Sequence, residues 1–246
     1  MILLIDGGNT TLGIGVRKDN QIEVISRIST PKLKEKNLLI DIFKKIDYPI
    51  TDVFTLSVVP SINDKIIQAS LDVFHLKPIF VNINMRNDIK ILLDNPQELG
   101  TDLYIDIYAS KLHYDKSIII DLGTATKILV VDQNVFLGGA IVPGLIGSFN
   151  SLFSTAELLN SVEITKPQGV IGNSTHECLI SGLIVGHATL IEGMVKKIKD
   201  KYGISNVLLT GGNSIYIKDE LTIDYKYVPD LIFEGLQLLY DTRNKD

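Results

Sequence analysis

The sequence predicts an α/β fold made of two similar halves, and three observations support this. Strand-like apolar runs alternate with segments whose apolar residues recur at helical spacing. Residues 2–16 (ILLIDGGNTTLGIGV) and 118–131 (IIIDLGTATKILVV) share one pattern: an apolar run, an aspartate, a glycine two residues later, a threonine five residues later and a second apolar run. The length of 246 residues is sufficient for two small domains.

The repeated pattern predicts, in each half, a strand, a tight glycine turn and a returning strand. Its matched residues are Asp6, Gly8 and Thr11 in the first copy, and Asp121, Gly123 and Thr126 in the second. The copies lie 115 positions apart (121 − 6). We interpret them as a duplicated domain with halves 1–113 and 114–246. Because no low-complexity linker separates the halves, we expect them to pack together.

The remaining elements follow from periodicity. The predicted helices cover residues 33–46, 63–75, 98–113, 176–200 and 229–241. The other predicted strands cover residues 52–59, 78–82 and 206–210, and the chain is expected to turn away from a strand over 138–145. Gly182, Gly186 and Gly193 are unfavourable within the fourth helix. We interpret them as positions of close packing, against a partner subunit.

Composition excludes several classes of protein. The net charge of −5 argues against a nucleic-acid or anionic-membrane partner. The single cysteine, Cys178, excludes an intrachain disulfide framework and a cysteine zinc cluster, and the four histidines show no metal-binding spacing. The apolar N-terminal run is four residues long and no segment approaches the roughly 18 apolar residues of a membrane span. We therefore expect a cytoplasmic protein.

The turn DGGNTT, from Asp6 to Thr11, is the first candidate phosphate site. An aspartate at a strand end can hold Mg²⁺ through water, glycines let backbone N–H groups approach phosphate oxygens, and the hydroxyls of Thr10 and Thr11 can donate to them. The alternative is an ordinary Asn/Gly hairpin turn. Since GxxxxGK[ST] is absent, and so is a GxGxxG between strand and helix, we expect paired hairpin turns to hold the phosphates, with the TGG turn at 210–212 beside the adenosine.

The segment GTD at 100–102 supplies a candidate catalytic carboxylate. A kinase needs a base that orients and deprotonates the acceptor hydroxyl, and Asp102 lies in the first turn of a predicted helix. The alternative is a solvated acid that complements the helix dipole.

Together, these segments resemble the type III pantothenate kinase family. The matching motifs, in chain order, are IDGGNT (5–10), NPQELGTD (95–102), DLGTATK (121–127), FLGGAIVPGL (136–145), GNST (172–175) and LLTGG (208–212). In the same order, they resemble six motifs of the family: DxGNT, a stretch ending in GADR, DFGTATT, LGGAIxPGx, GxNT and TGG. The resemblance extends over nearly the whole chain and implies duplicated ribonuclease-H-like (actin-like ATPase) domains with a cleft between them.

The resemblance also implies a function: ATP-dependent phosphorylation of pantothenate to 4′-phosphopantothenate, the first step of coenzyme A synthesis. It implies Mg²⁺, a monovalent cation (K⁺ or NH₄⁺) and a homodimer. Asp102 would be the general base, Asp121 the ligand of the monovalent cation, and Thr124 an ATP contact. The other ATP-binding residues would be Asp6, Gly7, Gly8, Asn9, Thr10, Thr11, Leu12 and Gly13. The substrate-binding residues would be Gly100, Thr101, Asp102, Leu103 and Thr175.

The chain departs from the family pattern mainly on the acceptor side. Leu103 stands where the family has an arginine, and leucine cannot pair with a carboxylate as a guanidinium does. Leu93 replaces an aromatic residue, Lys127 a threonine and Leu129 an aspartate. Two alternatives therefore stay open: a kinase of the same fold that acts on another hydroxyl compound, and a non-catalytic nucleotide-binding regulator similar to the Bvg accessory factor family.

Overall fold

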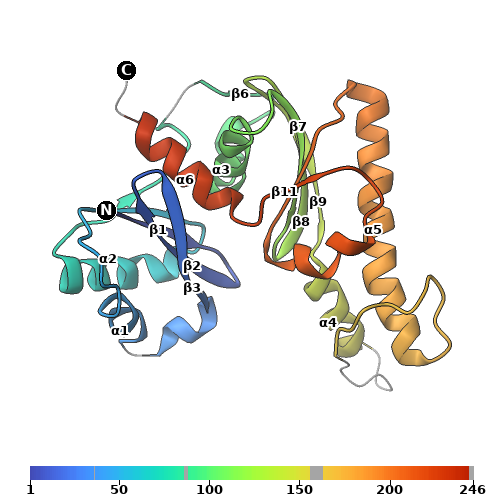
Figure 1. The fold of residues 1–246 in the computed structure, drawn as a ribbon, viewed down its shortest axis with the longest axis horizontal. Coiled ribbons are helices and arrows are strands. Elements are labelled where there is room, and N and C mark those ends of the chain that lie inside the picture. Colours follow the sequence, from blue (N-terminus) through green and yellow to red (C-terminus); the bar gives the residue numbers. More distant parts are fainter. Residues whose placement is uncertain (36, 86–87, 156–162, 244–246) are drawn as a thin grey trace. The chain divides into compact units, whose positions relative to one another are not determined.

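The computed structural model describes residues 1–35, 37–85, 88–155 and 163–243. Within them the chain forms two β-sheets and six α-helices, which confirms the predicted α/β class (Figure 1). It divides into two compact units: the first comprises Met1–Ile89, Leu93–Ala109 and the segment from Leu231 onward, and the second comprises Lys90–Leu92 and Ser110–Asp230.

The first sheet has the strand order β3-β2-β1-β4-β5. Its strands are β1 (Ile2–Gly7), β2 (Thr11–Lys18), β3 (Gln21–Ser29), β4 (Asp52–Ser57) and β5 (Ile79–Phe80). Strands β1, β2 and β3 form an antiparallel meander, whereas β4 runs parallel to β1, and β5 parallel to β4. The helices of this unit are α1 (Leu38–Phe43), α2 (Pro60–Phe74), α3 (Thr101–Ser110) and α6 (Leu231–Thr242).

Helices cover both faces of the first sheet (Figure 1). Leu3 and Ile5 of β1 share a buried cluster with residues of α1 and α2, including Phe43 and Ile66. On the opposite face, the ring of Phe233 in α6 lies directly over two glycines of β2, and the ring of Tyr240 meets that of Phe54 edge-on, with centroids 5.5 Å apart. Successive side chains of a strand point to opposite faces, so both faces of β1 are buried.

The second sheet repeats this arrangement. Its strand order is β11-β10-β7-β8-β9-β6, so the antiparallel meander β7-β8-β9 again lies beside two parallel strands, β10 and β11, and β6 extends the edge next to β9. The strands are β6 (Lys90–Ile91), β7 (Lys116–Leu122), β8 (Ala125–Asp132), β9 (Val135–Pro143), β10 (Val207–Thr210) and β11 (Lys226–Tyr227). The repeated strand order agrees with a duplicated domain.

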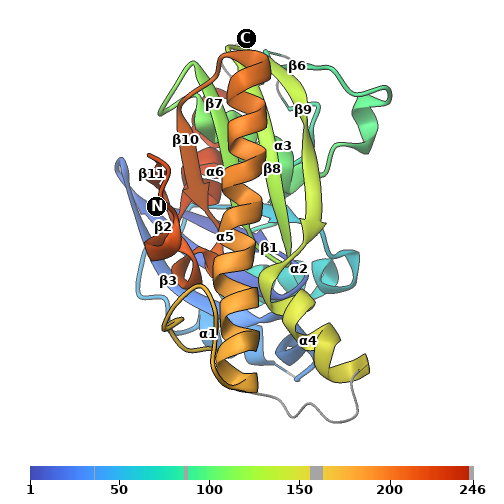
Figure 2. The same cartoon turned by 90° about the vertical axis from the view of Figure 1, so that its right-hand side faces the viewer.

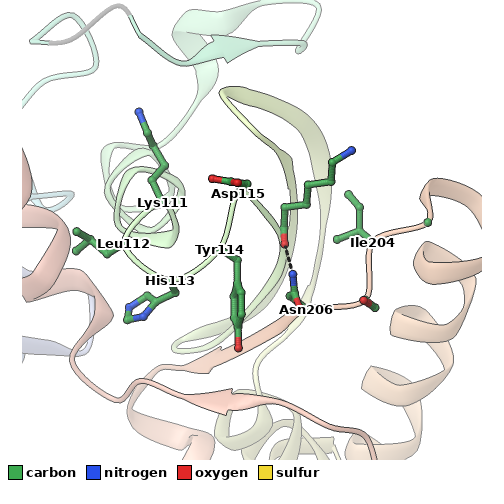
Figure 3. Close-up of a pocket in the computed structure, with 10 residues that line it drawn as sticks. Lys111, Leu112, His113, Tyr114, Asp115, Ile204 and Asn206 are labelled. Atoms are coloured by element: carbon green, nitrogen blue, oxygen red, sulfur yellow. Dashed lines mark hydrogen bonds between the residues drawn. The ribbon is translucent and has the colours of Figure 1, made fainter.

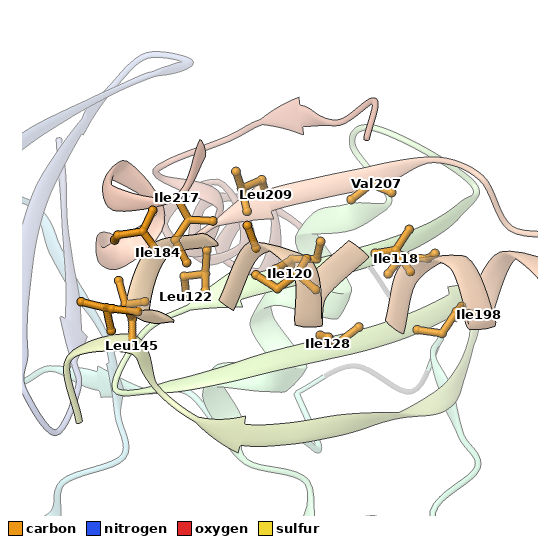
Figure 4. Packing of buried hydrophobic residues seen from close by; sticks show 14 of the residues in the cluster. Ile118, Ile120, Leu122, Ile128, Leu145, Ile184, Ile198, Val207, Leu209 and Ile217 are labelled. Carbon is orange, nitrogen blue, oxygen red and sulfur yellow. The ribbon is translucent and has the colours of Figure 1, made fainter. Parts of the chain in front are cut away.

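The core of the second unit lies between its sheet and the helices α4 (Leu145–Thr155) and α5 (Thr175–Tyr202). Helix α5 runs along one face of this sheet (Figure 2). Ile118, Ile120 and Leu122, which alternate along β7, point to this face and pack with Ile184 and Ile198 of α5 (Figure 4). The intervening residues Ile119 and Asp121 therefore belong to the other face of the sheet.

Helix α5 contradicts the expectation that no segment approaches a membrane span. Among the described helices it alone is long and apolar enough to cross a membrane, with a mean hydropathy of 1.7 over 18 residues. Its apolar character has another explanation, because 39% of that window is buried and Ile180, Ile191 and Val195 belong to the core of the second unit. We interpret α5 as a core helix with one exposed side.

The sequence predictions differ from the structure in several places. The expected halves were 1–113 and 114–246, but α6 belongs to the first unit, because Phe233 and its neighbours pack on the first sheet. The expected helix 33–46 shortens to α1, since Asn37 has a left-handed backbone with φ of 66°. Residues 138–143 continue β9, and α4 was not predicted.

Candidate functional site

The first phosphate turn connects β1 to β2 and is closed by a hydrogen bond from the Gly8 amide to the Thr11 carbonyl, at 3.0 Å. Two carbonyl groups of this turn accept hydrogen bonds from Thr30. The Thr30 hydroxyl donates to the Gly8 carbonyl at 2.7 Å, and the Thr30 amide donates to the Thr10 carbonyl at 2.9 Å. Because these carbonyl oxygens accept bonds from the protein, the exposed tip at Asn9 and Thr10 presents less negative charge to an anion.

Two of the expected ATP-binding residues lie inside the first unit instead of at the turn. Leu12 is fully buried in the core with α1 and α2, and Phe233 covers Gly13, where an added Cβ would come within 3.0 Å of the ring. Gly7 is also buried, and its carbonyl accepts from the Val58 amide at 3.0 Å. We therefore restrict the predicted phosphate contacts to the segment from Gly8 to Thr11.

Asp6 lies on the face of the first sheet that α6 covers. Its cross-strand partner in β2 is Gly13, and directly opposed antiparallel residues share a face. Since Phe233 of α6 lies over Gly13, the Asp6 carboxylate belongs to the same face as α6. Asp6 is half-buried and stands at the carboxyl end of β1, the end of a strand at which ligands bind in open α/β sheets.

Asp102 is the second residue of α3, on the same face of the first sheet. Helix α3 packs closely on α6, because Gly235 lies against Ile105 with no room for a side chain. The Asp102 carboxylate folds back over Gly100, where an added Cβ would come within 2.6 Å of Oδ1. The structure thus brings Asp6 and Asp102 to one side of one sheet, with the second carboxylate at a helix N-terminus.

The second phosphate turn connects β7 to β8 and repeats the closure of the first. The Gly123 amide donates to the Ala125 carbonyl at 3.1 Å. The strand register shows that this turn is one residue shorter than the first turn. Gly7 pairs with Leu12, which leaves residues 8–11 in the first turn, whereas Leu122 pairs with Thr126, which leaves residues 123–125 in the second. The predicted match of Thr11 with Thr126 is therefore wrong by one residue, and Ala125 is the counterpart of Thr11.

The TGG turn lies against the second phosphate turn. Strands β7 and β10 pair Asp121 with Thr210, and a Cβ added at Gly211 would overlap Asp121 Oδ1 and the Leu122 backbone. The side-chain amide of Asn213 donates to the Gly123 carbonyl at 2.8 Å. Sequence reasoning missed the support that Asn213 and Thr30 give to the two turns, since neither residue type marks a site by itself.

Two further contacts fix the second turn. His187 of α5 lies 2.8 Å from the Thr126 hydroxyl, and burial lowers the pKa of its imidazole, so a neutral ring holds this threonine. Gly144 packs so closely on the Thr124 carbonyl that no Cβ fits there, while Thr124 itself is exposed at the tip of the turn.

Lys127 is the cross-strand partner of Asp121, and its Nζ donates to Asp121 Oδ2 at 2.7 Å. The two side chains are only 16% and 12% exposed. The carboxylate expected to hold a monovalent cation thus already has an ammonium group on it. The residues do not fit a monovalent cation bound to Asp121 beside this ammonium.

Thr175, the expected pantothenate contact, is exposed at the first position of α5 in the second unit. Ser174 caps this helix, since its hydroxyl accepts from the Glu177 amide at 3.2 Å, and the Glu177 carboxylate in turn accepts from the Asn173 amide at 2.8 Å. Gly100, Thr101 and Leu103 belong to the first unit with Asp102. The predicted acceptor residues are therefore divided between the units.

The second unit also has a hollow of about 600 Å³, lined by residues 111–116 and 203–206 (Figure 3). The Asn206 side chain donates to the Lys116 carbonyl there at 3.0 Å. This hollow adjoins the amino ends of β7 and β10, whereas the phosphate turn follows the carboxyl end of β7. Within the described residues, no group of three or more His, Cys, Asp or Glu side chains could hold a metal ion by itself.

Comparison with known proteins identifies the family. The family model described as type III pantothenate kinase matches residues 2–197. A type III pantothenate kinase of Geotalea daltonii is 35% identical, over 100% of both chains, and one of Sulfurihydrogenibium sp. is 32% identical, over 97% of this chain and 99% of the relative. The chain belongs to the type III pantothenate kinase family. As a member it is an ATP-dependent kinase, and the family's reaction is the phosphorylation of pantothenate in coenzyme A biosynthesis.

Solved structures agree on the fold. A Campylobacter jejuni protein described as a Baf-family transcriptional activator has a TM-score of 0.61 at 18% identity, with 99% of this chain and 100% of that chain covered. The ethanolamine utilization protein EutJ of Carboxydothermus hydrogenoformans has a TM-score of 0.50 at 15% identity, covering 96% of this chain and 89% of that one. At these identities the likeness concerns the fold and carries no function to this member of the kinase family.

Proposed function

We propose that this kinase transfers the γ-phosphoryl group of ATP to the primary hydroxyl of pantothenate and releases ADP and 4′-phosphopantothenate. The observation that supports it most is the family membership over the full length of the relatives. The repeated turn adds to it, because both aspartate-bearing turns follow the carboxyl end of the first strand of a meander, and a phosphate-binding role accounts for both.

In the proposed reaction, the turn segments Gly8–Thr11 and Gly123–Ala125 bind the phosphates of ATP through backbone N–H groups and threonine hydroxyls. Mg²⁺ bound with ATP offsets the charge of the transferring phosphoryl group, and Asp6 is the residue that would hold it, through water. The TGG turn contacts the adenosine. Support for Asp6 in this role comes from its half-buried place at the end of β1, on the face that α6 covers.

Asp102 is proposed as the general base. The hydroxyl oxygen of the acceptor attacks Pγ, the bond from Pγ to the bridging oxygen of ADP breaks, and the hydroxyl proton passes to the Asp102 carboxylate. Gly100 lets this carboxylate lie over the start of α3, and Thr101, Leu103 and Thr175 are proposed to contact the acceptor. Leu103 gives the acceptor an apolar neighbour at the position where the family has an arginine.

An acceptor panel tests the substrate. We expect ADP formation from ATP with pantothenate, accompanied by a product heavier than pantothenate by one phosphoryl group. A sugar or another alcohol that is phosphorylated while pantothenate is not would contradict the choice of acceptor. ATP binding without ADP formation from any acceptor would favour the regulatory alternative. The hydrogen bond from Lys127 to Asp121 argues against Lys127 as a replacement for the missing arginine.

We also propose that the kinase is a homodimer that uses the exposed side of α5. Gly182, Gly186 and Gly193 lie on this side with Leu190, and a Cβ added at any of the three glycines would meet nothing within 4 Å. Such glycines lower helix stability without serving packing inside one chain. Analytical ultracentrifugation should give the mass of a dimer for the wild type and the mass of a single chain for Gly186→Arg. The control variant Gly147→Arg, on α4, should remain a dimer. A monomeric wild type would contradict the dimer.

The cytoplasm is the proposed location of the kinase. The thiol of Cys178 is exposed and forms no disulfide within the described residues, which suits a reducing compartment. Cell fractionation should recover the protein with the cytoplasmic fraction, and recovery with membranes would contradict this assignment.

A further inference from the structure

The aspartate of the second phosphate turn takes part in a buried ion pair with Lys127. Asp6 and Asp121 occupy the same position in their hairpins, at the end of the first strand and before the glycine turn. Opposite Asp6 the register places Gly13, which has no side chain, whereas opposite Asp121 it places Lys127. The duplicated hairpins thus differ in the residue that stands directly opposite the aspartate: a glycine in the first and a lysine in the second.

Lys127 and Asp121 are held in this pairing. They are directly opposed in the β7/β8 ladder, and Gly211, which follows β10, packs closely on the Asp121 carboxylate. With Nζ 2.7 Å from Oδ2 and both side chains largely buried, the ammonium is desolvated beside a desolvated carboxylate. Removing one partner of such a pair leaves an uncompensated buried charge.

The same hairpin offers a contrasting pair. Lys116 and Asp132 are also cross-strand partners of β7 and β8, with Nζ 3.0 Å from Oδ1, but their side chains are 48% and 33% exposed. Exposed pairs contribute little to stability and are screened by salt. Lys116 therefore provides a matched control for Lys127, with the same residue types on the same two strands.

We propose that the Lys127 ammonium is a built-in cation that replaces the monovalent cation expected at Asp121, so that this kinase works without added K⁺ or NH₄⁺. This inference rests on the proposed function for its role in catalysis. A lysine side chain ends in a singly charged ammonium group, which has the charge of K⁺ and the chemistry of NH₄⁺. A second cation on the Asp121 carboxylate would lie close to Nζ, and like charges at short range in a poorly solvated site repel strongly.

The consequence is that the activity of the enzyme no longer depends on the concentration of K⁺ or NH₄⁺. A diffusing cation occupies its site only to the extent that its concentration allows, whereas a lysine fixed by the strand register is present in every molecule. The charge beside the second phosphate turn is then independent of the medium. The variant Lys127→Thr restores the residue type that stands at this position in the family pattern and removes the tethered charge.

The test uses the whole protein and two readouts. The first is the melting temperature without nucleotide, in buffers in which KCl replaces tetramethylammonium chloride at constant ionic strength. We expect no K⁺-specific shift of the melting temperature for the wild type, Lys127→Arg or Lys116→Thr. For Lys127→Thr we expect a lower melting temperature, which K⁺ raises. The second is the rate of ADP formation with pantothenate, which K⁺ should raise by about tenfold or more only in Lys127→Thr.

Each outcome is decisive. A K⁺-specific rise in the wild-type melting temperature or rate would overturn the proposal, and so would a Lys127→Thr variant that folds but does not respond to K⁺. If Lys127→Thr does not fold, the wild type and Lys127→Arg still decide, because a K⁺ response in either contradicts a built-in cation. If pantothenate is not the acceptor, the proposed function fails in the rate assay, while the melting temperatures still report on Lys127.

Discussion

We expect the replacement of Asp102 with asparagine to lower kcat by roughly 10²- to 10⁴-fold, the usual contribution of a positioned general base. The amide keeps the size of the carboxylate and can still lie over Gly100 at the start of α3, but it cannot accept the hydroxyl proton. The melting temperature and the affinity for Mg²⁺-ATP should change little. The measurement is steady-state ADP formation with pantothenate, together with ATP binding by calorimetry.

Asp72→Asn is the matched control, because Asp72 is exposed on α2, on the other face of the first sheet. We expect wild-type kcat for this variant. If Asp102→Asn keeps more than about a tenth of the wild-type kcat, Asp102 is a first-turn acid that complements the helix dipole, and the base lies elsewhere.

Replacing Gly211 with alanine destabilises the second unit by about 2–5 kcal/mol, since two unfavourable effects combine. Gly211 has φ of 88°, in the left-handed region that a side chain disfavours, and its Cβ would overlap Asp121 Oδ1 and the Leu122 backbone. Relief of this overlap would move Asp121 and the turn that begins at Gly123. We therefore expect a lower urea midpoint and weaker ATP binding together.

The neighbouring Gly212 supplies the control for this effect. A Cβ there meets nothing within 4 Å, so Gly212→Ala should change stability by no more than about 0.5 kcal/mol. Equal urea midpoints for the two variants would show that the close approach of Gly211 to Asp121 is not a constraint on the fold.

Much of the fold was predictable because its signals are local. The apolar runs before Asp6 and Asp121 define buried strands, and the glycine two residues later defines the turn. The long apolar period of α5 was found within two residues at each end. The short strands β6 and β11, of two residues each, lack such a signal, because their pairing depends on neighbours far away in the sequence.

The parts that could not be predicted depend on tertiary contacts. Sequence spacing matched Thr11 with Thr126, and only the strand register shows the shorter second turn. The partner of Lys127 was undecidable, since a lysine side chain can reach several groups and the β7/β8 pairing selects Asp121. Thr30 acts through a hydroxyl that meets the Gly8 carbonyl, 22 positions away in the chain. No spacing rule joins such residues.

The central claim is that each of the two aspartate-bearing turns is a phosphate-binding element of this kinase. Amide hydrogen exchange with and without a non-hydrolysable ATP analogue and Mg²⁺ tests it most directly. We expect slower exchange in the peptides that cover Gly8–Thr11 and in those that cover Gly123–Ala125, at the same analogue concentration. Slower exchange in one turn alone, or in neither, would contradict the account.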